Sequence, residues 1–203
     1  MKRSVHSLSL VAAIAPAMLL TACGAKPVVG ILLPETGAAA SYGKSMRHGI
    51  ELAVEQATAD GSYPDALALH WADSGTDPDR AVTALRDLAG KGCKLVVAGV
   101  TSGEATPLLP VLEETQVVML SPSASAPNLT KDSRLFFRIF TSDDLEGRRA
   151  GRFLREDQDR ASVLILSEDS AQARGIEPPF RQVFEQSMAG KVVGRVLLTD
   201  PAW

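Results

Sequence analysis

The sequence predicts an α/β protein with a mainly parallel sheet and helices on both faces. The apolar run VVGILL at 28–33 leads through a Thr36-Gly37 turn into a segment whose apolar residues have helical spacing. From Pro27 onward, strand-like and helix-like segments alternate, and the helix-like segments span about 10–20 residues. Such alternation is typical of βαβ units, in which the strands lie parallel and the helices cover the sheet.

The elements follow from the apolar runs and their end signals. Strands are expected at 28–33, 66–72, 94–98, 117–120, 135–140, 161–166 and 192–198. Helices are expected over at least 46–57, then at 78–90, 103–115, 142–156 and 175–188. Asp77 and Pro78 suit the N-cap and the first position of the second helix, and Ser102 is expected to cap the third.

Four polar loops rich in small residues follow predicted strands, at 34–43, 73–77, 100–103 and 121–128. Right-handed crossovers bring such loops to one edge of a parallel sheet, where helix amides are unpaired. We therefore expect a ligand-binding surface at this edge. The stretch GAAASYGKS at 37–45 resembles a phosphate-binding loop, but it has five residues rather than four before Gly-Lys-Ser. Lys44 is therefore interpreted as a solvated residue of the first helix.

The amino terminus has the pattern of a secretory signal. Met1-Lys2-Arg3 precedes an apolar run at 8–20 that is short for a membrane span. The following Leu20-Thr21-Ala22-Cys23 resembles a bacterial lipobox, which implies cleavage after residue 22 and lipidation of Cys23. Residues 1–22 are thus predicted to be a signal peptide, and 23–27 a lipid-anchored segment. The chain would be attached to a membrane of the cell envelope, the outer membrane in a Gram-negative source; the alternative is an ordinary signal peptide with a chance cysteine.

The composition argues against several functions. Loss of Lys2 and Arg3 with the signal peptide changes the formal net charge from −3 to −5, and no basic stripe remains to bind nucleic acid. Cys93, beside an apolar run, is expected to be a small core residue. His48 and His70 lack the spacing of metal ligands, and no motif predicts a metal or a cofactor.

The predicted strand at 135–140 is followed by a break at Thr141-Ser142-Asp143, after which the βα pattern restarts. We interpret this break as a crossing between two lobes. Residues 28–141 would form a nearly complete first lobe, and 142–203 the start of a second lobe.

With these loops assembled, the chain resembles the type I periplasmic binding proteins, specifically the branched-chain amino acid (Leu/Ile/Val) receptors of ABC importers. The resemblance covers about 28–198. It rests on the following motifs: the opening Pro-x-Thr-Gly and Tyr-Gly pattern, Asp73 with Asp77-Pro78, the strand and loop at 94–102, SPSASAPNLT at 121–130, and Phe137-Arg138 with Asp143 and Gly147.

The resemblance implies a clamshell of two α/β lobes that close on a ligand. It implies that the first lobe holds an amino acid's carboxylate at Ser102 and at Ser123, Ala124 and Ser125, and that Tyr42 contacts the ligand side chain. Small hydroxyl residues at helix starts allow several donors to approach one anion. Capping and turn formation are the alternative roles of the serines, and packing on the first helix is that of Tyr42.

The sequence also departs from the family pattern. Gln172-Ala173 stands where the family often has Tyr-Gly, which removes an aromatic wall and argues against a hydrophobic ligand. Pro178-Pro179 is expected to delay or kink the following helix. The sequence also stops roughly halfway through the family's usual span, so we expect a fragment or truncated reading frame, with poor stability and weak or no ligand binding.

The leading hypothesis is a lipid-anchored extracytoplasmic receptor that binds a small, polar, amino-acid-like solute and delivers it to an ABC permease. The alternative is a lipoprotein of the same fold whose cleft binds and activates a cell-wall synthase. The sequence has no Gly-x-Ser-x-Gly elbow and no carboxylate pair placed for acid–base chemistry, so an enzyme is not expected.

Overall fold

The computed structural model describes residues 27–62 and 68–198. Cys23 and the predicted signal peptide therefore lie outside the described residues. Within them, the elements are β1 (Val28–Leu33), α1 (Ala40–Ala59), β2 (Ala68–Asp73), α2 (Pro78–Gly90), β3 (Leu95–Val97), α3 (Ser102–Thr115), β4 (Val118–Ser121), α4 (Leu129–Asp132), β5 (Phe136–Arg138), α5 (Asp143–Arg152), β6 (Ser162–Glu168), α6 (Ala171–Arg181) and β7 (Lys191–Leu198). Two π-helical segments, η1 (Phe153–Asp157) and η2 (Gln182–Ser187), extend α5 and α6. No helix in the described ranges is both long and apolar enough to cross a membrane.

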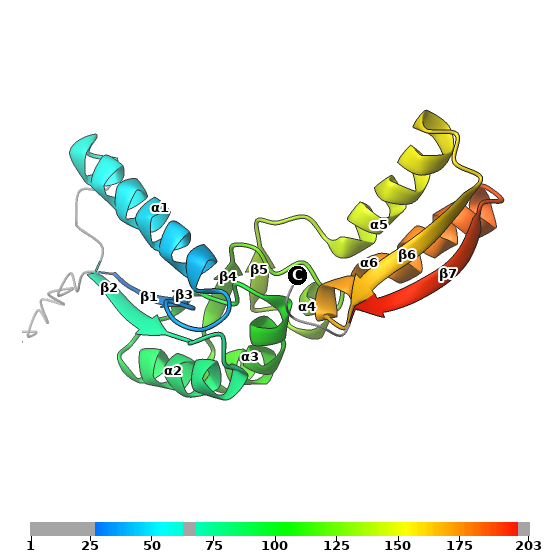
Figure 1. Cartoon of the computed structure of the whole chain (residues 1–203). Helices are drawn as coiled ribbons and strands as arrows, with labels where there is room; N and C mark the ends of the chain where they lie inside the picture. Colours follow the sequence, from blue (N-terminus) through cyan, green and yellow to red (C-terminus); the bar gives the residue numbers. More distant parts are fainter. Residues whose placement is uncertain (1–26, 63–67, 199–203) are drawn as a thin grey trace, which may run out of the picture.

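The strands form two parallel sheets (Figure 1). The first has the order β2-β1-β3-β4-β5, and the second pairs β6 with β7. Every pairing between neighbouring strands is parallel. The predicted fold class, a mainly parallel α/β structure, is thereby confirmed. We call the first sheet with α1–α4 the N-terminal unit, and the second sheet with α5, α6 and the two π-helical segments the C-terminal unit.

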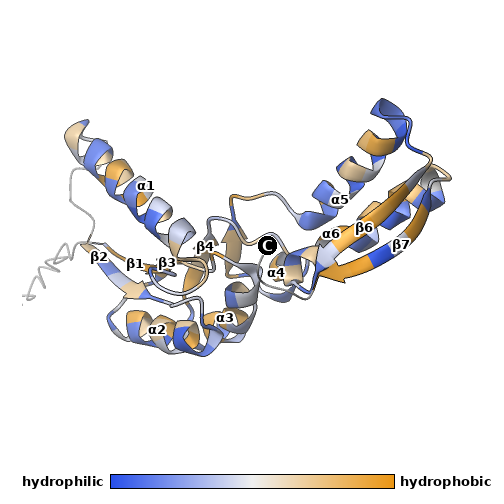
Figure 2. Cartoon of the chain, viewed as in Figure 1, coloured by the Kyte–Doolittle hydropathy of each residue, from blue (hydrophilic) through white to orange (hydrophobic). Residues whose placement is uncertain are grey.

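Helices cover both faces of the first sheet (Figure 1). The main core lies between the sheet and α2 and α3, and it includes Leu85 and Leu88 of α2, Leu108 and Leu112 of α3, and Cys93. The predicted role of Cys93 as a core residue is therefore confirmed, and burial raises the pKa of its thiol. A smaller cluster under α1 joins Ile31, Leu33 and Val100, with Met46, Ile50 and Trp71 packed against it. In Figure 2 hydrophobic and hydrophilic residues interchange along each of these helices, as is typical of helices that bury one face.

The C-terminal unit is built on the close packing of α5 against α6. A Cβ atom at Gly147 of α5 would lie 2.3 Å from the carbonyl oxygen of Ile176 in α6, so only glycine allows this approach. Phe180 and Phe184 stack with ring centroids 5.3 Å apart, and both are buried. On the two-stranded sheet, by contrast, several large apolar side chains are exposed. They are Leu164, Leu166, Val193, Val196 and Leu197.

Two helix starts differ from the sequence expectations. The cap of α3 is Thr101 rather than Ser102, because the Thr101 Oγ1 accepts the amide of Glu104 at 3.1 Å. Helix α6 begins at Ala171 rather than 175, because the Ser170 Oγ caps it by accepting the amide of Ala173 at 3.1 Å. Pro178 and Pro179 lie inside α6 and do not delay its start; the π-helical segment η2 follows three residues after Pro179.

The loop between β1 and α1 is held by Asp73 at the end of β2. The Asp73 carboxylate accepts the amides of Glu35 and Thr36, at 2.8 and 3.2 Å, and the Thr36 hydroxyl at 2.7 Å. It also accepts the Gly75 amide at 2.8 Å. Burial alone would raise the pKa of Asp73, but the hydrogen bonds from the Thr36 hydroxyl and the three amides outweigh it and lower the pKa. The loop at 73–77 thus supports the start of α1.

Asp73→Asn is expected to destabilise the N-terminal unit by about 1–3 kcal/mol at pH 7, because an amide nitrogen cannot accept the Thr36 hydroxyl. The pKa of Asp73 is lower in the folded state than in the unfolded chain. The stability that its ionised form contributes is therefore complete above pH ~5 and is lost as the pH falls through the folded pKa. Urea unfolding at pH 7 and at about pH 3 measures both effects, with the exposed Asp79→Asn as the matched control. A deficit of the same size at both pH values would contradict this role.

Candidate functional site

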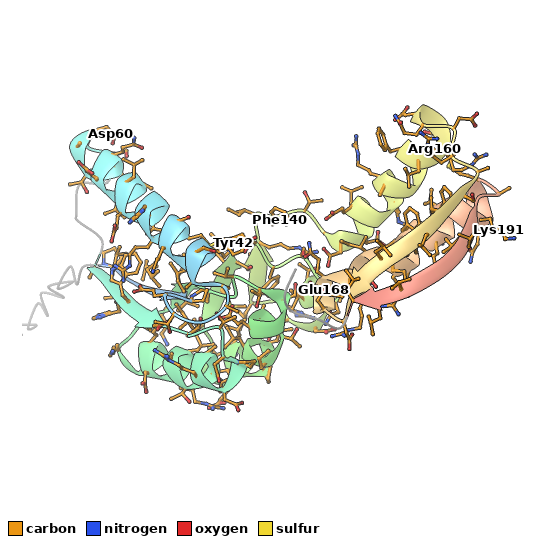
Figure 3. All side chains as sticks on the ribbon, in the orientation of Figure 1. Tyr42, Asp60, Phe140, Arg160, Glu168 and Lys191 are labelled. Atoms are coloured by element: carbon orange, nitrogen blue, oxygen red, sulfur yellow. The ribbon has the colours of Figure 1, made fainter. Side chains whose placement is uncertain are left out.

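A pocket of about 440 Å³ lies where the two units meet. The N-terminal unit contributes Tyr42 of α1, residues 100–103 at the start of α3, and Ser123 and Ser125 of the loop after β4. Phe140 of the crossing segment and four residues around the start of α6 complete the lining: Glu168, Ser170, Ala171 and Gln172. Figure 3 shows Tyr42, Phe140 and Glu168 around the space between the units.

Four of the predicted binding residues line this pocket together: Tyr42, Ser102, Ser123 and Ser125. Ala124 does not line it. Its side chain is 1% exposed, and its amide donates to the Ser121 hydroxyl at 3.0 Å. Of the four loops expected to share the ligand surface, the one at 73–77 contributes no lining residue; it supports the 34–37 loop instead.

The N-terminus of α3 faces the pocket with two unpaired amides. The Thr101 hydroxyl binds the amide of Glu104, and the Thr101 carbonyl binds that of Ala105. Ser102 and Gly103 come before Glu104 in the first turn of the helix, and neither of their amides has a partner among the described residues. Together with the helix dipole, they favour an anion at this end of the pocket.

The Ser102 hydroxyl can act only as a donor toward the pocket. Its Oγ accepts the amides of Ser125 and Ala126, at 3.2 and 3.1 Å. A hydroxyl has two acceptor positions and one proton, so both acceptor positions are occupied and the proton remains available. The two amides come from the loop after β4, so Ser102 also fixes that loop against α3.

The Ser123 hydroxyl has the opposite polarity. It donates to the carbonyl oxygen of Val100, which can only accept. Its proton is therefore engaged, and it presents lone pairs to a solute. The wall formed by the N-terminal unit thus offers donors at Ser102 and Gly103 and an acceptor at Ser123. The sequence pattern identified these serines but could not assign these roles, which depend on which carbonyl or amide each hydroxyl meets.

The C-terminal unit brings a second helix start to the pocket. Ser170 caps α6, and the amides of Ala171 and Gln172 have no partner in the described part of the chain. The predicted surface loop at 100–103 lines the pocket with all four of its residues, although only Ser102 was predicted as a binding residue. Gln172 stands at the predicted site of the lost aromatic wall, whereas Phe140, Glu168, Ser170 and Ala171 were not predicted to line the pocket. A local signal existed for the helix start, because Ser170 follows a strand as Thr101 does. The opposition of the two helix starts depends on the arrangement of the units, which no local pattern encodes.

Asp143 is buried at the junction of the two units. Its amide donates to the carbonyl of Ser125 at 3.0 Å, while neither carboxylate oxygen has a hydrogen-bond partner among the described residues. Its side chain lies against Gly175 of α6, where a Cβ atom would be 2.5 Å from Oδ2. Burial raises the pKa of Asp143, the negative charge of Glu146 raises it further, and the positive charge of Arg138 partly opposes this effect. Asp143 therefore links the Ser125 loop to α5 and α6.

A second hollow, of about 940 Å³, runs along α5 and η1. Its lining includes the exposed Phe140, Leu145 and Phe153 and the charged Arg149 and Arg152. It lacks the paired helix starts of the first pocket, and its walls come from one helix and the segments next to it. The pocket between the units is therefore the candidate site.

A five-stranded parallel α/β unit, joined to a second α/β unit over a pocket rich in small residues, is the architecture of a type I periplasmic binding protein. The family model for periplasmic binding proteins matches residues 27–202. The leucine-, isoleucine-, valine-, threonine- and alanine-binding protein of Pseudomonas aeruginosa is 31% identical over 192 residues, which cover 92% of this chain and 52% of that protein. The Leu/Ile/Val-binding protein BraC3 of Rhizobium johnstonii is 30% identical over 81% of this chain and 46% of that protein.

Among solved structures, the isoleucine complex of LivJ from Streptococcus pneumoniae matches with a TM-score of 0.77 and 23% identity. The match covers 87% of this chain and 51% of LivJ. This likeness supports the fold. The chain therefore belongs to the periplasmic binding protein family. It spans about half the length of the curated relatives it matches.

Proposed function

We propose that the chain binds a small amino-acid-like solute between two lobes and serves an ABC importer as its extracytoplasmic receptor. The lobes correspond to 28–141 and 142–203. The sequence of residues 1–23 supports export and lipidation at Cys23, which would hold the receptor on the membrane surface beside its permease. The Pseudomonas relative, named for binding five amino acids, supports the same assignment.

The observation that carries this proposal is the polarity of the pocket wall. The amides of Ser102 and Gly103 and the Ser102 hydroxyl form a donor group that suits a carboxylate. The Ser123 hydroxyl, whose proton is bound by Val100, suits an ammonium group. A zwitterion that spans these two positions satisfies both ends, whereas a solute with only one of the two charges leaves one end unpaired.

Titration calorimetry on the whole chain with three small probes tests this. L-Alanine carries both groups, L-alaninamide lacks the carboxylate, and propanoate lacks the ammonium. We expect L-alanine to bind at least ~10-fold more tightly than either of the other probes, because each lost charged contact costs about 1.4 kcal/mol or more. Saturation-transfer NMR extends the comparison to millimolar affinities. Equal binding of L-alanine and L-alaninamide would contradict the proposal.

A further inference from the structure

The wall contributed by the C-terminal unit carries two polar side chains that bind no other group in the described part of the chain. Glu168 ends β6, and Gln172 lies in the first turn of α6; both line the pocket. Among the described residues, neither side chain has a hydrogen-bond or ion-pair partner, unlike Ser102, Ser123 and Ser170 in the same pocket. Both residues are exposed, so water solvates them while the pocket is open.

Among the described residues that line the pocket, the charge of Glu168 has no counterpart. They include neither lysine nor arginine, and Glu168 is the only charged side chain among them. The neighbouring Asp169 is different, since it forms an ion pair with Arg174 and does not line the pocket. When the lobes close over a solute and exclude water, the carboxylate of Glu168 and the amide of Gln172 need partners from the solute itself.

This requirement discriminates between solute side chains. A branched alkyl group would leave Glu168 and Gln172 unpaired as water leaves, and an acidic group would be repelled by Glu168. A side chain that ends in N–H donors satisfies both residues, because a carboxylate accepts only and an amide both accepts and donates. Tyr42 and Phe140 flank the space and suit the aliphatic part of such a side chain.

We propose, building on the function proposed above, that the solute is an α-amino acid whose side chain ends in N–H donors, an amide, ammonium or guanidinium group. Glu168 and Gln172 are the residues that determine this specificity. The backbone of the solute lies against the start of α3, and its side chain points toward the start of α6.

The experiment compares L-glutamine, L-arginine, L-leucine and L-glutamate as probes with the whole chain, by competition in saturation-transfer NMR. We expect L-glutamine and L-arginine to bind at least ~10-fold more tightly than L-leucine, since sites built to pair polar groups reject analogues that lack them. L-Glutamate is expected to bind most weakly.

Two variants assign the preference to its residues. Gln172→Leu is expected to raise the affinity for L-leucine relative to that for L-glutamine by ~10-fold. Glu168→Gln is expected to lower the affinity for L-arginine by ~10-fold and to change that for L-glutamine little. Asp169→Asn is the matched control, because it removes a neighbouring exposed carboxylate outside the pocket. All three positions are exposed, so circular dichroism is expected to show unchanged folding.

The outcomes separate this inference from the proposed function. If L-leucine binds more tightly than L-glutamine while L-alanine still binds more tightly than L-alaninamide, the specificity inference is overturned and the receptor function stands. If neither L-alanine nor any of the four amino acids binds, both are overturned. A preference for L-glutamine that survives Gln172→Leu and Glu168→Gln unchanged also overturns the inference.

Discussion

Gly147→Val is expected to unfold the C-terminal unit while the core of the N-terminal unit stays folded. A Cβ atom at residue 147 would lie 2.3 Å from the carbonyl oxygen of Ile176, 2.9 Å from Pro179 Cγ and 3.0 Å from the Phe180 amide nitrogen. Two of these three atoms belong to the α6 backbone, so no side-chain rotation relieves the overlap. The helices must separate, and the stacked Phe180 and Phe184 then lose their packing.

The expected cost is about 3 kcal/mol or more, at the upper end of overpacking in a core. Hydrogen-exchange mass spectrometry measures it by region: α5 and α6 are expected to lose protection, while β1 and α3 keep it. Gly49→Ala is the matched control, because Gly49 lies in α1 with nothing within 4 Å of an added Cβ. There, alanine is expected to stabilise the helix by about 0.5–1 kcal/mol. Wild-type protection of α6 in Gly147→Val would show that the two helices do not pack as described.

Ser102→Ala is expected to give the largest loss of solute binding, about 10- to 100-fold. The hydroxyl supplies the donor to the solute carboxylate, and hydrogen bonds to charged groups contribute about 1.5–3 kcal/mol. The substitution also removes the acceptor of the Ser125 and Ala126 amides, which are buried. The loop after β4 is therefore expected to loosen, with a fall in unfolding free energy of about 1–3 kcal/mol.

Matched variants separate these two effects. Ser102→Thr keeps the hydroxyl and is expected to retain most of the binding and stability. Ser123→Ala removes the acceptor and the hydrogen bond to the Val100 carbonyl, but no donor toward the solute. It is therefore expected to weaken the binding of L-alanine while leaving that of propanoate unchanged. For each variant, calorimetric titration gives the dissociation constant of the solute and urea unfolding gives the free energy of unfolding. An unaltered dissociation constant in Ser102→Ala would remove this serine from the site.

Much of the N-terminal unit could be predicted because its signals are local. Asp77 and Pro78 mark the start of α2, and the structure has the Asp77 carboxylate accepting the Arg80 amide at 2.8 Å, with Pro78 as the first helical residue. The strand order could not be read from the apolar runs, but parallel pairing followed from the helices between them. Gly37, with a φ of +82°, confirms the turn expected after β1.

The errors arose where two local signals competed. Thr101 and Ser102 are adjacent hydroxyl residues that could each cap α3. The residue that decides between the two caps is Glu104, three residues after Thr101. Its carboxylate accepts the Thr101 hydroxyl and also the buried Ser74 hydroxyl. For α6, the Pro178-Pro179 pair predicts a delayed start, whereas the cap at Ser170 starts the helix at Ala171. The packing of α5 against α6 supports a helix that sequence propensity alone would shorten.

Only half of the candidate site could be predicted from the sequence, because only that half depends on local signals. Serines in loops after strands could be identified from sequence, since these loops share one edge of the sheet. Glu168 and Gln172 enter the pocket only because the crossing segment after β5 places a second helix start opposite the first. That placement depends on buried contacts such as Asp143 against Gly175, which link residues far apart in the sequence.

Amide NMR of the ¹⁵N-labelled chain during titration with L-alanine tests the central claim, that a solute carboxylate binds at the start of α3. The largest shifts are expected at the amides of Ser102 and Gly103, and L-alaninamide is expected to leave these two signals in place. Shifts centred instead on Arg149 and Arg152, in the hollow along α5, would place the carboxylate elsewhere and contradict the account.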